Sequence, residues 1–114
     1  MMSSKKNLPL SEGALEVIAA WFRTLGEPSR LKILRALEQG EKNISDLVTA
    51  TGLTQANVSR HVQALVDAGM VGRRREGLSS ICCIADETIP KLCEQVCGAL
   101  QSRFEKQARQ LSGR

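Results

Sequence analysis

The spacing of hydrophobic residues along this chain predicts five helices and one hairpin. Apolar side chains recur at intervals of three and four positions in five segments of the chain. The segments run from residue 11 or 12 to about 25, from 28 to the glycine at 40, from 44 to 51, from 54 to 69, and from about 86–90 to 111. Such spacing is typical of amphipathic helices. Residues 70–75 and 79–84 flank a turn with a glycine and predict two paired strands. We therefore expect a mainly α fold with a β-hairpin.

The helix over residues 54–69 has one apolar side and one polar side. Thr54 is a good N-cap, and Gly69 is a good stop. The apolar side carries Val58, Val62, Leu65 and Val66. The polar side begins with small and hydrogen-bonding residues and ends at Asp67, which a polyanion would repel. That order indicates a helix that enters DNA with its N-terminal end, whereas a solvated face of an ordinary core helix is the alternative.

The preceding segment completes a helix-turn-helix pattern. Residues 44–51 form a short helix for which Ser45 is the expected cap, and the turn 52–54 contains a glycine. The hairpin that follows is then a wing. Its first strand carries three consecutive arginines, with Arg73 and Arg75 on one face and Arg74 on the other. The predicted DNA contacts are Thr54, Gln55, Ala56, Asn57, Ser59, Arg60, His61, Gln63, Arg73, Arg74 and Arg75.

The first and last helices carry more apolar surface than one small domain needs. A last helix of about 22 residues spans roughly 33 Å, so its stripe should be buried against a second copy of the chain. For the first helix, packing onto the core is the alternative to a dimer contact. The predicted dimer interface contains Leu15, Ile18, Phe22, Leu92, Val96, Leu100 and Phe104.

Composition agrees with one DNA-binding domain. The chain has 114 residues, 42% hydrophobic and 25% charged, with a net charge of +4 that favours a polyanionic partner. We expect a flexible arm over residues 1–10 and one domain over 11–112. We find no apolar run long enough for a membrane span and no signal-peptide pattern, so we expect a cytoplasmic protein whose four cysteines are thiols.

Several motifs resemble a known family. Residues 25–34 (LGEPSRLKIL), 44–47 (ISDL), 58–65 (VSRHVQAL), 68–71 (AGMV) and 74–77 (RREG) are similar to the ArsR/SmtB winged helix-turn-helix repressors, and the likeness covers about residues 14 to 110. The resemblance implies a homodimer, joined through its first and last helices, that binds palindromic operator DNA. It also implies release from DNA when a metal, a metalloid or a reactive sulfur species binds.

The chain departs from the family at the known metal sites. The thiolates that the family places before Asp-Leu are missing from residues 43–47 (NISDL). The family's zinc site on the last helix uses Asp, His and Glu, but the single histidine is His61. We expect His61 to be a packing or phosphate-contact residue in preference to a metal ligand. The resemblance therefore does not identify the ligand.

The four cysteines are the candidate residues for binding or sensing an inducer. Cys93 and Cys97 are one helical turn apart, with a Cβ separation of about 5 to 6 Å that exceeds the roughly 3.5 to 4.5 Å of a disulfide. A thiophilic atom such as As(III) or another soft metal suits that gap, with a third sulfur from Cys82 or Cys83 if the hairpin returns nearby. Cys82 and Cys83 should point to opposite faces of their strand. Structural packing and a thiol-oxidation or persulfide switch are the alternatives.

These observations predict a DNA-binding transcriptional regulator, with the apo or reduced dimer repressing and modification of Cys93 and Cys97 releasing it. A winged-helix module that binds protein and not DNA is one alternative. A thiol enzyme is another, but His61 lies in a different element from the cysteines and lacks a third group to orient it, so we expect no catalysis.

Overall fold

The computed structural model describes residues 10–112. Its elements, in order, are α2 (Glu12–Leu25), α3 (Pro28–Leu37), β1 (Lys42–Asn43), α4 (Ile44–Thr51), α5 (Gln55–Asp67), β2 (Val71–Glu76), β3 (Ser79–Ile84) and α6 (Thr88–Ser112). The predicted mainly α fold with a hairpin wing is confirmed. The expected arm over residues 1–10 lies outside the described range except for Leu10.

Side-chain caps begin most of the helices. The hydroxyl of Ser11 accepts a hydrogen bond from the Ala14 amide, and a Glu27 carboxylate oxygen accepts one from the Arg30 amide, both at 3.0 Å. The prediction that Ser45 caps α4 is wrong. The cap is Asn43, whose Oδ1 accepts from the Asp46 amide at 2.7 Å. Asn43 has an extended backbone because it belongs to a strand, which leaves its side chain free to satisfy a first-turn amide.

The sheet has three antiparallel strands in the order β1-β3-β2. The β2–β3 hairpin is the predicted wing, and Gly77 in its turn has a φ of 63° that favours glycine. Strand β1 was not predicted, because two residues are too few to show an alternating pattern. Its register pairs Lys42 with Cys82 and Asn43 with Ile81, so it fixes the loop after α3 against the wing.

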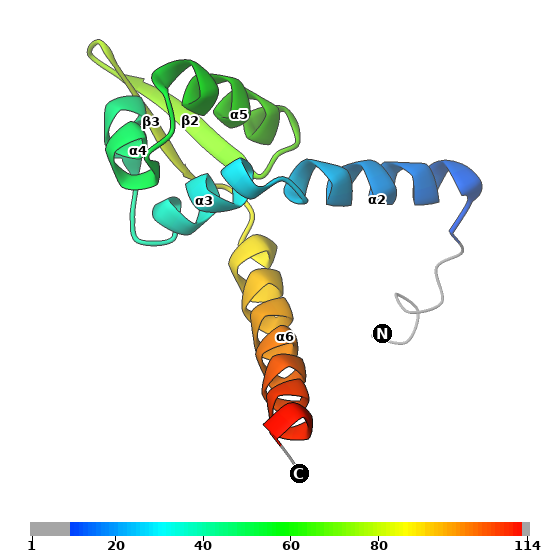
Figure 1. Ribbon diagram of the computed structural model, residues 1–114. Helices are drawn as coiled ribbons and strands as arrows, with labels where there is room; N and C mark the ends of the chain where they lie inside the picture. The colour runs from blue at the N-terminus through cyan, green and yellow to red at the C-terminus, as the bar shows by residue number, and fades with distance from the viewer. Residues whose placement is uncertain (1–9, 113–114) are drawn as a thin grey trace.

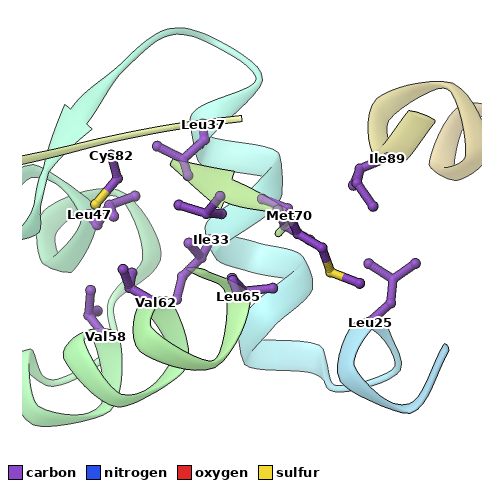
Figure 2. Packing of buried hydrophobic residues seen from close by; sticks show 12 residues of the cluster. Leu25, Ile33, Leu37, Leu47, Val58, Val62, Leu65, Met70, Cys82 and Ile89 are labelled. Atoms are coloured by element: carbon purple, nitrogen blue, oxygen red, sulfur yellow. The ribbon is translucent and has the colours of Figure 1, made fainter. Parts of the chain in front are cut away.

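The core lies between α3, α4, α5 and the sheet. Its buried apolar residues are Leu25, Ile33, Leu34, Leu37, Leu47, Val58, Val62, Leu65, Met70, Val71, Cys82 and Ile89. Figure 2 shows Met70 reaching toward Leu25 of α2 and Ile89 of α6. These two are the only buried hydrophobic residues of α2 and α6 in the described range. Figure 1 shows α2 and α6 leaving the body as two separate arms.

Within residues 10–112, no helix combines the length and the hydropathy that a bilayer span requires.

Candidate nucleic-acid interface

Helix α5 has the two-faced structure that its sequence predicts. Thr54 caps it, accepting a hydrogen bond from the Asn57 amide at 3.1 Å, and Gly69 follows its C-terminal end with a φ of 77°. Its inner side is formed by Val58, Val62 and Leu65, all fully buried, together with His61. Its exposed residues are Gln55, Ala56, Arg60, Gln63 and Asp67, with Asn57 and Ser59 half-buried beside them. One side of α5 therefore presents hydrogen-bonding groups to solvent.

The polar groups on α5 are held in defined positions. Arg60 Nη2 donates to Asn57 Oδ1 at 2.8 Å, and Gln63 Nε2 donates to Asp67 Oδ1 at 2.8 Å. Arg73 of β2 donates from Nη1 to Gln63 Oε1 at 2.9 Å, which joins the wing to the helix. Because these contacts neutralise little positive charge, the N-terminal half of α5 and Arg73 form one basic, hydrogen-bonding surface. In Figure 1, α5 and the hairpin lie on the same part of the body.

The three wing arginines differ in their surroundings. Arg75 is exposed, and the described chain offers its guanidinium no hydrogen bond or ion pair. Arg74 lies on the other face of the strand, where it contacts Glu41 and Glu76. The hydrogen bond from Arg74 lowers the pKa of the Glu41 carboxyl. The expected alternation of faces along the strand is thus present, but the positive charge of Arg74 is compensated by carboxylates.

The structure places His61 inside the protein, with 5% of its surface exposed, so its position agrees with the expected packing role and not with a phosphate contact. Arg30 donates from Nε to His61 Nδ1 at 3.1 Å and from Nη1 to the Thr24 carbonyl at 3.2 Å. Glu27 Oε1 lies 4.0 Å from His61 Nε2. Burial is the main cause that lowers the pKa of His61, and the nearby cations Arg60 and Arg30 lower it further while Glu27 opposes them. His61 therefore connects α5 to α3 through Arg30, and Arg30 in turn contacts the end of α2.

Sequence reasoning missed the roles of Arg30, Glu27 and Glu41. Arg30 and His61 are 31 residues apart, and Glu41 and Arg74 are 33 apart. No local spacing reports such pairs. The only available signal was the position of Glu27 and Arg30 beside Pro28 in the motif of residues 25–34, which indicated a helix start and not a contact with α5.

The four cysteines have different environments. Cys82 is fully buried in the core, and burial raises the pKa of its thiol while the charge of Arg73 opposes that shift. Cys83 points to the other face, as expected, where its Sγ packs against Gly72. Cys93 is half-buried against the core, and burial followed by the charge of Glu38 raises the pKa of its thiol. Cys97 is exposed.

The structure does not bring a third sulfur to the pair on α6. No group of three or more His, Cys, Asp or Glu side chains positioned to hold a metal occurs in the part of the chain from residue 10 to 112. Cys82 lies in the core beside Leu47, away from α6 (Figure 2). Cys93 and Cys97 therefore form a two-thiol site at most within one protomer.

The predicted dimer residues form exposed apolar surface on one protomer. The exposed fraction is 50% for Leu15, 53% for Phe22 and 59% for Phe104. Ile18, Val96 and Leu100 are exposed as well, whereas Leu92 packs partly against the core. These side chains lie on α2 and α6, the two arms that project from the body in Figure 1. Apolar surface of this extent on projecting helices marks an interaction face.

Comparison with known proteins gives consistent matches. Residues 27–72 match the family described as bacterial regulatory protein, arsR family. A probable mercury resistance operon repressor of Streptomyces lividans is 40% identical over 54% of this chain, and the match spans 50% of that repressor. The transcriptional regulator NmtR of Mycobacterium tuberculosis is 30% identical over 81% of this chain and 77% of its own length.

A solved structure shares the fold. It is the solution structure of a homodimeric winged helix-turn-helix DNA-binding domain from Mycobacterium bovis, a possible ArsR-family transcriptional regulator. The two sequences are 33% identical, the alignment covers 82% of this chain and 87% of that domain, and the TM-score is 0.74.

Proposed function

Because this chain belongs to the ArsR family of bacterial regulatory proteins, we propose that it represses transcription as a homodimer on operator DNA and that a thiol-reactive inducer releases it. Members of this family are transcriptional regulators and not enzymes, so the chain acts by binding DNA. A bacterial repressor must reach the chromosome, which lies in the cytoplasm, and we therefore propose a cytoplasmic location. The contact residues, the dimer and the inducer are our proposal.

The observation that carries the proposal is the outward side of α5 next to the wing. Gln55, Ala56 and Asn57 lie in its first turn, where a helix in the major groove meets base edges, and Arg60 follows one turn later. The first-turn amides and the helix dipole favour phosphate at the same end. Arg73 and Arg75 extend the basic surface along the wing. We propose that these two arginines contact the duplex together with the outward residues Thr54, Gln55, Ala56, Asn57, Ser59, Arg60 and Gln63.

The exposed apolar side chains of α2 and α6 support a homodimer. A stripe that includes Phe22, Val96, Leu100 and Phe104 would cost free energy if it remained in water. A second copy of the chain offers a matching stripe by symmetry. Joining two protomers along these helices would present two α5 helices to successive major grooves of one duplex.

Cys93 and Cys97 are the proposed sensor thiols. They lie one turn apart on α6, on the helix that we assign to the dimer contact, and Cys97 is exposed. Two thiolates at this spacing suit a soft metal or metalloid ion, and each thiol loses its proton as a sulfur ligand forms. A third sulfur for As(III) would come from outside this pair. A reactive sulfur species or an oxidant at the same thiols is the second candidate inducer.

The similarity to a mercury resistance repressor favours a thiophilic metal among these inducers. The raised pKa of the Cys93 thiol means that it is protonated at neutral pH until an ion displaces the proton. Cys82, by contrast, is fully buried in the core and serves packing. A regulator in which all four cysteines are structural is the alternative.

DNA binding is tested by fluorescence anisotropy with a labelled duplex that the wild-type protein selects from a randomised pool. We expect affinity to fall steeply with salt, and Arg60→Ala to weaken binding and to reduce the log–log salt slope by about 0.9 for each phosphate that Arg60 neutralises. Light scattering on the same samples should report a dimer. A monomer at micromolar concentration without salt-dependent affinity would point to a protein-interaction module instead.

The inducer is tested by native mass spectrometry after exposure to arsenite, mercuric ion, peroxide or polysulfide, together with DNA release in the anisotropy assay. The double variant Cys93→Ser, Cys97→Ser should bind DNA as tightly as the wild type and should lose both adduct and release. Cys83→Ser is the matched control, because it removes a half-buried thiol from another element. Equal release of wild type and double variant would leave the cysteines a structural role only.

A further inference from the structure

Arg74 is the wing arginine that the structure holds most firmly. Its Nη1 and Nη2 donate to the two carboxylate oxygens of Glu41 at 2.8 and 2.9 Å, and its Nε and Nη2 donate to Glu76 Oε2 at 3.0 and 2.9 Å. A guanidinium has five N–H donors, and four contacts use most of them. An isolated surface ion pair contributes little to stability, whereas a bidentate arginine–carboxylate contact within a network of charges keeps its side chains in place.

The two carboxylates come from different parts of the fold. Glu76 is two residues along the same strand, whereas Glu41 directly precedes β1. The register aligns Arg74 with Ile81 of β3 and Ile81 with Asn43 of β1. Arg74 therefore reaches across the central strand to the opposite edge of the sheet. This contact connects the outer half of β2, whose residues are all exposed, to the loop between α3 and β1.

Electrostatics argues against Arg74 as a phosphate contact. Two carboxylates surround one guanidinium, so the cluster carries a net negative charge and does not attract a polyanion. Moving Arg74 to a phosphate would leave Glu41 and Glu76 unpaired next to the DNA backbone. Arg75, on the other face, has no such competitor.

We propose that Arg74, Glu41 and Glu76 form a latch that fixes the direction of the wing, and that Arg74 is a positioning residue for DNA binding and not a DNA contact. The latch holds β2 of the hairpin to the residue before β1, so that Arg73 and Arg75 meet phosphate without a prior ordering of the wing. The inference rests on the proposed DNA-binding function. It reassigns one of the three arginines that the sequence groups together.

The direction in which one substitution changes DNA affinity distinguishes a latch from a phosphate contact. Glu41→Ala removes a negative charge near the DNA and frees Arg74. If Arg74 contacts phosphate, affinity for the selected duplex should rise. If Arg74 is a latch, affinity should fall by about twofold to fivefold per protomer, the size of effect that a surface ion-pair network supports. Glu87→Ala is the matched control, because Glu87 is an exposed acid before α6 that does not touch Arg74.

Salt dependence and a charge swap give a second readout. Arg75→Ala should lower the salt slope by about 0.9 for each phosphate that Arg75 neutralises, whereas Arg74→Ala should weaken binding with an unchanged slope. The double variant Glu41→Arg, Arg74→Glu restores the ion pair with reversed signs, so it should recover affinity relative to Arg74→Glu alone. A slope that falls with Arg74→Ala, or a double variant weaker than Arg74→Glu, would overturn the latch.

Amide hydrogen exchange of the free protein tests the latch without DNA. Glu41→Ala and Arg74→Ala should speed exchange in the hairpin segment 73–80 and leave α4 unchanged, and Glu87→Ala should change neither. Unchanged exchange in the hairpin would refute the latch even in a protein that binds DNA. If the wild type binds no duplex, the proposed function fails separately, because this measurement does not depend on it.

Discussion

Replacing His61 tests the buried network that connects α5 to α3 and α2. His61 Nδ1 accepts from the Arg30 guanidinium, so the structure requires a neutral ring with its proton on Nε2. His61→Leu keeps an apolar body but leaves Arg30 Nε without its acceptor in a half-buried position. His61→Asn keeps an oxygen near the place of Nδ1 and serves as the conservative control.

The expected loss of stability follows from the hydrogen bond that is broken. A hydrogen bond to a charged group contributes about 1.5 to 3 kcal/mol, and a donor left unpaired costs a similar amount. Because Arg30 retains its bond to the Thr24 carbonyl, we expect His61→Leu to lower the free energy of unfolding by about 1 to 3 kcal/mol at pH 7. His61→Asn should lose less. Urea unfolding followed by circular dichroism at one fixed protomer concentration measures both.

The pH dependence has a definite sign. Burial, the first cause, lowers the pKa of His61 in the folded protein below the value of 6.5 that it regains on unfolding. Between those two values the unfolded chain binds more protons, so this contribution to stability is fully present above about pH 6.5 and is lost as pH falls toward the folded pKa. Each pKa unit of depression corresponds to about 1.36 kcal/mol.

A single histidine makes the test clean, because no other side chain with an ordinary pKa titrates between pH 5 and 7. Wild-type stability should fall across that range, whereas His61→Asn and His61→Leu should lack this component. Parallel pH profiles for all three proteins, or a His61→Leu variant as stable as the wild type at pH 7, would refute the reasoning.

Three further predictions follow from burial and exposure. Phe104→Glu places a charge on the exposed apolar stripe of α6, and a twofold interface contains this substitution twice, once in each protomer. The dimer dissociation constant should therefore rise about tenfold or more. Analytical ultracentrifugation measures the change, with Lys91→Glu as the control. Leu47→Ala empties a fully buried site in α4 and should cost about 2 to 5 kcal/mol in urea unfolding, whereas a cost below about 1 kcal/mol would contradict the core described above. Thr54→Ala removes the α5 cap and should cost about 0.5 to 2 kcal/mol, with Thr54→Ser retaining most of the wild-type stability.

Local sequence determined the elements of this protein. The cap at Thr54, the apolar spacing from Val58 to Leu65 and the glycine at 69 lie within one helix, so their physical effects act over at most four residues. The wing followed from two alternating segments around Gly77. The family motifs, and with them the class of regulator, are likewise continuous stretches of sequence. The exception was the start of α4, where an unpredicted two-residue strand made Asn43 the cap.

Tertiary structure decided which polar side chains are free. Arg73, Arg74 and Arg75 are identical in sequence terms, but the sheet places Arg74 beside Glu41 and leaves Arg75 exposed. His61 borders the apolar side of α5, and only the packing of α3 determined that it is buried against Arg30. Such pairs join residues more than 30 positions apart, and their energies depend on how elements pack and not on local periodicity. Charge along the chain therefore predicted a DNA-binding surface, whereas the fold determined which charges remain available to it.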